Sequence, residues 1–376
     1  MRVLHVHSGN LYGGVETLLA TLWHEREACP SMETAFALCF DGRLSEELRE
    51  AGATVHALGA VRARRPLSVR RARRALGLLL RRERFDAVVC HAPWAQAIFG
   101  TVARSAEASR VFWMHAPASG THWLERWARM TTPDLVVCNS RFTAESAGRL
   151  YPRARAEVVY CPVRFSDAET QPSERERSAT RAEFDTPDDA VVIIQVSRME
   201  ALKGHAMHLE ALGLLKDVPG WVCWQIGGAQ RPAEEVYLDG LKRLASRLGI
   251  AGRVLFAGQR PDVPRLLAAA DIYCQPNTGP ESFGISFVEA MHAGLPVVTT
   301  AIGGALEVVD DSCGLFVPPC NATELAQGLR GLIENSTLRT SLGKSGSRRA
   351  HQLCETSARL TEIHELLSSL VRRKAA

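Results

Sequence analysis

Short apolar runs alternate with segments of helical spacing over the first part of the chain, from residue 3 to residue 161. Each run is mostly apolar, which is typical of strands that are buried on both faces of a parallel sheet. The segments between the runs are long enough for the helices that cover such a sheet. The predicted strands are 3–7, 34–39, 54–58, 87–90, 110–114, 135–138 and 157–161.

The alternation stops over residues 166–189, where charged residues, serine, threonine and proline predominate. This composition predicts a polar linker that carries at most a short helix. A second alternation then begins, and it predicts a second doubly wound α/β domain over 190–350 beside a first one over 1–165. Its predicted strands are 190–196, 222–226, 254–257, 272–275, 297–300 and 314–317.

Sheets of this kind bind ligands in a crevice outside the carboxyl ends of their strands. Two such domains that face each other predict an interdomain cleft as the ligand site. The longest apolar segments, such as 190–196, have strand length and fall well short of the roughly 20 residues that span a bilayer. Residues 1–7 are typical of a first buried strand and lack the pattern of a signal peptide.

The ten cysteines include no C-x-x-C pair, and most lie in or beside apolar runs. This usage favours reduced, buried thiols in a cytoplasmic protein. Metal-binding patterns are also missing from the sequence, because neither H-E-x-x-H nor an Asp-x-Asp tripeptide occurs. We therefore expect no bound metal and no cofactor.

The net charge of +4 is too small to indicate nucleic-acid binding, but it is spread unevenly. Ten arginines and a single acid, Glu83, lie between Arg62 and Arg84. An apolar stripe of helical spacing runs through this stretch and predicts a surface helix with an arginine-rich outer face. Two interpretations stay open: a solvated basic face, or peripheral contact with an anionic membrane or an acidic acceptor.

A loop with two adjacent glycines follows the first predicted strand. Gly13 and Gly14 come directly before a helix that is predicted to start near residues 15–16. Glycines at this place let the backbone approach an anion, toward which the free N–H groups of the first helical turn point. The G-x-G-x-x-G fingerprint of a dinucleotide site is absent. An anion site and a plain tight turn both remain open here.

An arginine and a lysine follow the first strand of the second domain. Arg198 and Lys203 lie five residues apart at the predicted carboxyl end of that strand, and Gly204 stands where the loop turns into a helix. A guanidinium and an ammonium so placed can converge on one phosphate group. The alternative is a pair of solvated surface cations.

Two glutamates flank a Phe-Gly sequence before another predicted helix, at 285–293. Gly284 precedes this helix, whose first N–H groups suit a diphosphate. Glu281 and Glu289 then lie at the edge of the anion site, where a carboxylate suits the hydroxyls of a ribose or a sugar. The alternative is that both glutamates only favour the helix N-terminus.

These segments together resemble the family 4 glycosyltransferases. The similarity runs from about residue 3 to about residue 370 and is most specific in the C-terminal half, although residues 160–164 depart from the Asn-Gly or Asn-Pro turn that is frequent in the family. The similar segments are Gly13-Gly14-Val15-Glu16, Ser197-Arg198 with Lys203-Gly204, residues 258–263, Glu281 to Glu289 with Ala290-Met291, residues 294–298, Gly303-Gly304 with Glu307, and residues 314–319.

The resemblance implies a GT-B fold, in which two Rossmann-like domains face an interdomain cleft. It implies that the second domain holds most of a nucleotide sugar and that transfer retains the anomeric configuration. The segment 351–376 is predicted to be helical by its spacing, and in this fold it would cross back to the first domain. By this resemblance, Arg198 and Lys203 would contact the diphosphate. Glu289 would bind the ribose hydroxyls, and Glu281 would bind the hydroxyls of the donor sugar.

Further positions around the donor are implied by the same resemblance. The backbone N–H groups of Phe283, Gly284 and Ile285 would lie along the sugar and phosphates, and Gly14 with Gly13 would approach from the first domain. Arg260 would lie near the nucleobase. His115 matches a histidine that the family places beside the donor sugar; without the family, it would equally fit a histidine that is hydrogen-bonded in the core.

We therefore expect a retaining glycosyltransferase that moves a hexose or N-acetylhexosamine from a nucleotide diphosphate sugar to a hydroxyl of a glycan, a lipid-linked or a small-molecule acceptor. Family frequency favours a UDP-sugar. Two alternatives remain: an epimerase or hydrolase of the GT-B fold, and a non-catalytic sugar-nucleotide-binding scaffold. The expected location is the cytoplasm, with the inner face of the membrane included if the 62–84 stretch binds lipid.

Overall fold

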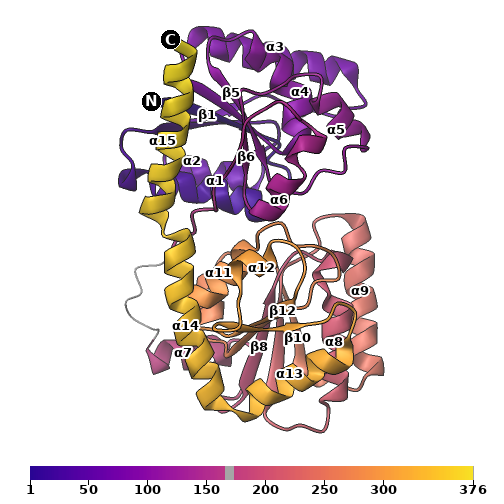
Figure 1. The fold of residues 1–376 in the computed structure, drawn as a ribbon. Coiled ribbons are helices and arrows are strands. Elements are labelled where there is room, and N and C mark those ends of the chain that lie inside the picture. Colours follow the sequence, from indigo (N-terminus) through magenta and orange to yellow (C-terminus); the bar gives the residue numbers. More distant parts are fainter. Residues whose placement is uncertain (166–172, 376) are drawn as a thin grey trace. The chain divides into compact units, whose positions relative to one another are not determined.

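Two parallel sheets form the centres of two units of the chain (Figure 1). The computed structural model describes residues 1–165 and 173–375. Met1–Arg164 and Cys354–Ala376 make up the first unit, and Phe165–Leu353 make up the second. The predicted fold class, with two doubly wound α/β domains, is confirmed.

The described part of the first unit contains a seven-stranded parallel sheet in the order β3-β2-β1-β4-β5-β6-β7. Two of its strands, 87–91 and 135–138, are buried along their whole length, as continuous apolar runs require. The strands are β1 (Arg2–His7), β2 (Glu33–Leu38), β3 (Val55–Ala57), β4 (Ala87–His91), β5 (Ser109–Met114), β6 (Leu135–Cys138) and β7 (Ala156–Val158).

Helices and short turns connect these strands. In α3, Val69, Ala72 and Leu76 are buried in the core while most of the arginines are exposed, so the predicted amphipathic helix is confirmed. The helical elements are α1 (Gly14–His24), η1 (Arg26–Ala28), α2 (Arg43–Glu50), α3 (Pro66–Arg82), α4 (Ala92–Arg104), α5 (Trp123–Ala128), α6 (Arg141–Glu145), η2 (Ala147–Arg149) and α15 (Thr356–Ala375).

The described part of the second unit contains a six-stranded parallel sheet in the order β10-β9-β8-β11-β12-β13. Its strands are β8 (Val191–Val196), β9 (Trp221–Ile226), β10 (Val254–Gly258), β11 (Ile272–Gln275), β12 (Val297–Thr300) and β13 (Gly314–Val317). The order reverses between β8 and β11, and ligands of open α/β sheets bind at such a switch point, outside the carboxyl ends of the strands.

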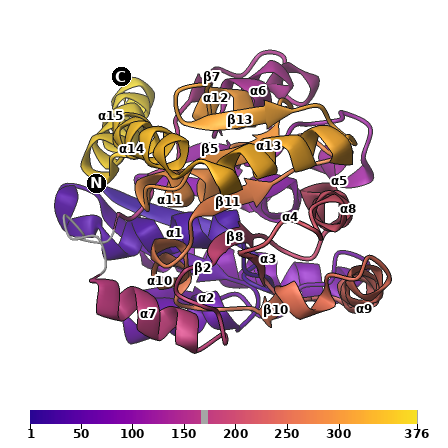
Figure 2. The ribbon, with the colours of Figure 1, turned by 90° about the horizontal axis from the view of Figure 1, so that it is seen from below.

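Helices cover both faces of the second sheet. Figures 1 and 2 show α8 and α9 on the side opposite to α7 and α11. The helical elements are α7 (Glu174–Ala182), η3 (Ala201–Lys203), α8 (His205–Leu214), α9 (Pro232–Arg247), η4 (Ala251–Arg253), α10 (Val263–Ala268), α11 (Ile285–His292), α12 (Ala305–Val308), α13 (Ala322–Glu334) and α14 (Ser336–Cys354).

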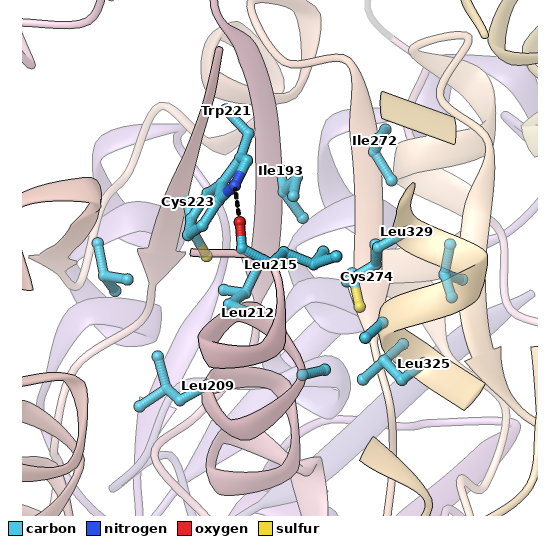
Figure 3. Packing of buried hydrophobic residues seen from close by; sticks show 14 of the residues in the cluster. Ile193, Leu209, Leu212, Leu215, Trp221, Cys223, Ile272, Cys274, Leu325 and Leu329 are labelled. Carbon is cyan, nitrogen blue, oxygen red and sulfur yellow. Dashed lines mark hydrogen bonds between the residues drawn. The ribbon is translucent and has the colours of Figure 1, made fainter. Parts of the chain in front are cut away.

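One apolar core joins α8, α9 and α13 to the second sheet (Figure 3). Ile193, Cys223 and Cys274 point into this core from three neighbouring strands. The indole N–H of Trp221 donates to the carbonyl of Leu215 at 3.0 Å, so that its only polar atom is satisfied inside the core. This packing fixes the sheet whose carboxyl ends form the candidate site.

The predicted strands agree with the observed ones to within about a residue, apart from the last strand of the first unit. The prediction of 157–161 is wrong at its end, because β7 stops at Val158. Val159, Cys161 and Val163 remain buried beyond that point, so their apolar pattern reflects a buried connection and not a longer strand.

The C-terminal helix begins later than predicted. Residues 351–354 still belong to α14, and a break at Glu355 separates them from α15. The Glu355 carboxylate accepts hydrogen bonds from the backbone N–H groups of Ser357 and Ala358, at 3.0 and 2.6 Å, and so caps α15. Lys374 at the far end donates to the carbonyl of Ala108, which ties α15 to the first unit.

Part of the predicted linker is packed structure. Residues 166–172 lie outside the described residues, but 173–189 form α7 and a turn that belong to the second unit. Arg181 of α7 is 1% exposed and donates to Asp271 at 2.7 Å and to the carbonyls of Ala269, Asp188 and Ala190. The burial of this arginine could not be predicted, because the sequence around it is polar. Its guanidinium holds the turn together through these hydrogen bonds.

Two further features concern the described part of the chain as a whole. Its helices include none that is both long enough and apolar enough to cross a membrane. Its ten cysteines are free, and all but the exposed Cys320 are buried.

Removal of the Arg181 guanidinium tests this packing. Arg181→Ala leaves several buried carbonyls without a donor, and we expect the second unit to lose roughly 3 kcal/mol of unfolding free energy. Urea titration followed by far-UV circular dichroism measures this loss. Arg175→Ala, on the exposed face of the same helix, is the control and should change stability by less than about 0.5 kcal/mol. Equal stabilities of the two variants would contradict the assignment.

Candidate functional site

An ion pair joins the loops that follow β8 and β11. Lys203 Nζ donates to Glu281 Oε2 at 2.7 Å, and the two side chains are only 19% and 11% exposed. The loops themselves are also connected: the N–H of Thr278 donates to the carbonyl of Leu202 at 2.9 Å, and its hydroxyl donates to the carbonyl of Ala201. The structure therefore brings Lys203 and Glu281 together at the switch point of the sheet.

Polar neighbours hold the Glu281 carboxylate in place. The side-chain amides of Gln275 and Asn277 both donate to Oε2 at 3.3 Å, and the N–H of Ser282 donates to Oε1 at 3.0 Å. Burial acts to raise the pKa of Glu281, but the Lys203 charge and these hydrogen bonds outweigh it and hold the pKa below its usual range. Glu281 is thus ionised at neutral pH.

Gly204 shapes the backbone beside Lys203. It has φ of 75° between η3 and α8, a left-handed conformation that a glycine adopts without strain. A Cβ at this position would overlap the carbonyl group of Pro276. The side-chain amide of Gln195, in β8, donates to the carbonyl of Lys203 at 2.9 Å and holds this turn in place.

Arg198 has partners that the sequence did not indicate. Its Nη2 contacts Glu234 of α9 at 2.7 Å and Glu200 at 3.0 Å. Burial acts to raise the pKa of Glu234, but the N–H of Gln230 and the Arg198 guanidinium keep it below its usual range. The Nε of Arg198 is buried and has no hydrogen-bond partner among the residues that the structure describes. This donor is free to bind an anion.

The start of α11 lies beyond Glu281 in the chain. Gly284 has φ of 95° and caps the helix, while the side chain of Phe283 is buried. The N–H groups of Ile285 and Ser286 have no acceptor within the helix, as is usual at a helix start, whereas the N–H of Phe287 donates to the carbonyl of Gly284 at 3.0 Å. On the next turn, Glu289 is half-buried, and its carboxylate has no hydrogen bond or ion pair with any described residue. Burial raises the pKa of Glu289 to about 7.

Arg260 has different partners. It contacts Glu183 and Asp262, both at 2.8 Å, and its guanidinium lies 5.5 Å from the ring centre of Phe184. Among the described residues it thus belongs to a separate charged group at the end of α7. Its predicted place near a nucleobase stays a prediction.

The remaining predicted residues lie in the first unit. Gly13 is extended and precedes α1, which begins at Gly14. His115 follows β5 and is half-buried. Its Nε2 is joined to Nδ1 of His91 at 2.9 Å, a contact between segments far apart in sequence that no local pattern indicates.

Comparison with known proteins identifies the class. Residues 12–167 match the family model of glycosyltransferase family 4, and residues 176–349 match that of the glycosyl transferases group 1. The chain belongs to the family 4 glycosyltransferases. The prediction of a transferase from the resemblance is therefore confirmed.

Similar proteins cover most of this glycosyltransferase. LpsE of Rhizobium meliloti, a lipopolysaccharide core biosynthesis glycosyltransferase, is 28% identical over 71% of each chain. A GDP-mannose-dependent alpha-(1-6)-phosphatidylinositol monomannoside mannosyltransferase of Mycolicibacterium smegmatis is 29% identical over 74% of this chain and 75% of that protein. Other relatives, D-inositol 3-phosphate glycosyltransferases among them, align over about half of their own length.

Solved structures agree with the fold. HepE of Anabaena, crystallised with UDP and glucose, superposes with a TM-score of 0.84 at 24% identity, covering 98% of this chain and 100% of HepE. The GT-B fold predicted from the resemblance is confirmed.

Substitution of Gly204 tests how the backbone positions Lys203. Gly204→Ala forces a side chain into left-handed backbone and against the Pro276 carbonyl, and we expect it to destabilise the second unit by about 2 kcal/mol. Gly240→Ala is the control, because Gly240 lies within α9 with open space around its Cα; it should be neutral or stabilise by up to roughly 1 kcal/mol. Urea titration compares them, and a neutral Gly204→Ala would contradict the strained turn.

Proposed function

We propose that this glycosyltransferase moves a hexose or N-acetylhexosamine from a nucleotide diphosphate sugar to a hydroxyl acceptor, with retention of the anomeric configuration. The observation that carries the proposal is the buried Nε of Arg198, which no described residue accepts from and which lies at the same sheet edge as the Lys203–Glu281 pair. A buried donor without a partner is rare, and an anion such as a diphosphate would satisfy it.

The two cations would act on the leaving group. Transfer breaks the bond between the anomeric carbon and an oxygen of the β-phosphate, whose electron pair stays on the nucleoside diphosphate. Lys203 has three N–H donors and uses one on Glu281, so two are left for phosphate oxygens. In a site that excludes water, fixed cations stabilise the growing charge strongly. The proposal includes no divalent metal, since these cations and the start of α11 take its place.

The two glutamates would bind hydroxyls of the donor. Glu281 is ionised, and its Oε2 already accepts from Lys203, Gln275 and Asn277. Its Oε1 accepts from the N–H of Ser282 and has a lone pair left for a hydroxyl of the sugar. Glu289 has no described partner, and ribose hydroxyls would supply one. The N–H groups of residues 283–285 and Gly14 complete the proposed contacts, with Arg260 near the base.

A UDP-sugar is the proposed donor. HepE was crystallised with UDP and glucose, whereas the mannosyltransferase of M. smegmatis is GDP-mannose-dependent, so the family uses more than one base. The acceptor is proposed to be a hydroxyl of a glycan, a lipid-linked or a small molecule. Thermal-shift assays with UDP, GDP and ADP and with their sugar conjugates identify the base, because a bound nucleotide raises the melting temperature of the folded chain.

Removal of the lysine ammonium should slow the reaction. We expect Lys203→Ala to lower the transfer rate on the order of 100-fold, the size that follows loss of one preorganised charge-stabilising donor. Release of nucleoside diphosphate from the donor measures this rate. Lys216→Ala removes an exposed lysine of the same unit and should leave the rate unchanged. Equal rates of the two variants would rule out Lys203 as a leaving-group contact.

Product analysis separates the alternatives. A transferase consumes the donor only with an acceptor, whereas an epimerase or hydrolase converts it without one. A non-catalytic scaffold would bind nucleotide and convert no donor with any acceptor.

Donor binding should depend on pH through Glu289. Its carboxyl group has a pKa of about 7, and only the ionised form, which prevails above that pH, accepts hydrogen bonds through both oxygens. We expect UDP-glucose to bind roughly tenfold more tightly at pH 8 than at pH 6. Calorimetric titration measures this, and UDP-glucose is chosen because its diphosphate diester does not titrate in that range. Glu289→Gln should bind without this dependence; a dependence that persists in it would exclude Glu289 as the cause.

Peripheral membrane contact through α3 is proposed as a second feature. Leu67 and Leu78 are 70% and 52% exposed, and Arg70, Arg71 and Arg74 lie between them at helical spacing on the exposed surface. Exposed leucines among arginines suit an anionic lipid surface.

Not every arginine of this helix belongs to that exposed surface. Arg73 is turned inward, donates to the carbonyls of Ile98 and Ala97 of α4, and lies 5.6 Å from the ring centre of Trp127. A test of membrane binding should therefore leave Arg73 in place.

A triple substitution tests the membrane proposal. The charges of Arg70, Arg71 and Arg74 each contribute about 1 kcal/mol to binding of an anionic surface. We expect their joint change to glutamine to weaken binding to phosphatidylserine-containing vesicles at least 10-fold in sedimentation assays. The matched control changes exposed cations of α9 to glutamine, namely Lys242, Arg243 and Arg247. Unchanged binding of the α3 variant would exclude this surface.

A further inference from the structure

Three histidines of the first unit form a hydrogen-bonded chain across its sheet. His5 of β1 is joined through Nδ1 to Nε2 of His91, the last residue of β4, at 2.9 Å. The Nδ1 of His91 is in turn joined to Nε2 of His115, after β5, at 2.9 Å. Each histidine thus occupies one of three neighbouring strands, or the residue just after it, in the order β1-β4-β5.

Aromatic stacking fixes the ring of His115, the last of these three hydrogen-bonded histidines. The rings of His91 and His115 are stacked with centres 5.2 Å apart, and Trp113 stacks on both. His115 therefore has little freedom to turn. Its other ring nitrogen, Nδ1, has no hydrogen-bond partner among the described residues, and the residue is half-buried.

The three hydrogen-bonded histidines are uncharged. Burial lowers the pKa of His5 and of His115 to about 3 and that of His91 well below its ordinary value, and the neighbouring imidazoles add to the effect at His91 and His115. The other titratable groups near it are His7 and Glu16, which pair with each other at 2.6 Å. Each of the three rings consequently carries one hydrogen.

Burial at the inner end decides where those hydrogens lie. The Nε2 of His5 is buried and has no hydrogen-bond partner within residues 1–165 and 173–375, and His5 lies against the ring of Phe36. If this nitrogen carried the hydrogen, an N–H group would be buried without an acceptor, which is very rare in proteins. The hydrogen of His5 is therefore on Nδ1 and points to His91. His91 must then donate from its own Nδ1 to Nε2 of His115.

We propose that His91, backed by His5, is a positioning residue that holds the hydrogen of His115 on Nδ1, so that His115 presents an N–H donor to an oxygen of the bound substrate. This inference rests on the proposed glycosyl transfer for the identity of that substrate. It assigns His115 a donor role and excludes it as a proton acceptor through Nδ1. The hydrogen on Nδ1 and the orientation of the ring follow from residues deep in the sheet.

Nitrogen NMR tests the proposal without reference to activity. Long-range ¹H–¹⁵N spectra of the full chain with ¹⁵N-labelled histidine report which ring nitrogen carries the hydrogen. We expect His115 and His91 both in the Nδ1–H form at neutral pH, with the His115 signal assigned from its loss in His115→Asn. A His115 in the Nε2–H form, or a charged His91, would overturn the proposal.

Variants of His91 connect this state to function. His91→Phe keeps a ring in the stack but donates nothing, so His115 should lose its single Nδ1–H form. We expect kcat to fall about tenfold and the donor KM to stay within about twofold, since only orientation is lost. His91→Asn returns an amide N–H near the place of Nδ1. It should restore much of the Nδ1–H form of His115 and much of kcat. His364→Gln, on α15, is the control and should change neither the spectrum of His115 nor kcat.

The outcomes separate this inference from the proposed function. If the wild type converts no donor, the glycosyl transfer proposal fails while the spectra still decide the state of His115. An unchanged kcat in His91→Phe, together with a changed His115 spectrum, would overturn the positioning role.

Discussion

The ammonium of Lys203 and the carboxylate of Glu281 lie 2.7 Å apart and largely out of water, and the rest of the candidate site depends on this pair. Either charge alone would be expensive to bury at this place. Their approach requires the left-handed turn at Gly204 and the contacts between the loops after β8 and β11. A cation held in this way is oriented before any substrate arrives, which is the condition for effective stabilisation of a leaving group.

Much of the fold could be predicted from the sequence, because parallel strands that are buried on both faces appear as continuous apolar runs. The strand predicted at 190–196 agrees with β8 to within one residue, and the helix predicted in the arginine-rich stretch is α3. Both cases rest on local periodicity. The residues that flank the switch point, Arg198 and Lys203, could also be predicted, since strand ends and helix starts are local features too.

Partners that come from distant segments could not be predicted. Glu234 lies 36 positions after Arg198, and nothing in the sequence around it distinguishes it from the exposed acids of an amphipathic helix. The chain from His91 to His115 depends on the strand order, which the sequence does not display. The burial of Arg181 could not be predicted either, because the sequence around it is polar and only the fold shows that its side chain is buried.

A crystal structure of the full chain with an intact UDP-sugar tests the central claim most directly. The account predicts that oxygens of the diphosphate lie about 3 Å from Lys203 Nζ and from the guanidinium of Arg198, with the phosphates at the start of α11. A diphosphate bound elsewhere, with Lys203 paired only to Glu281 as it is without substrate, would contradict the account.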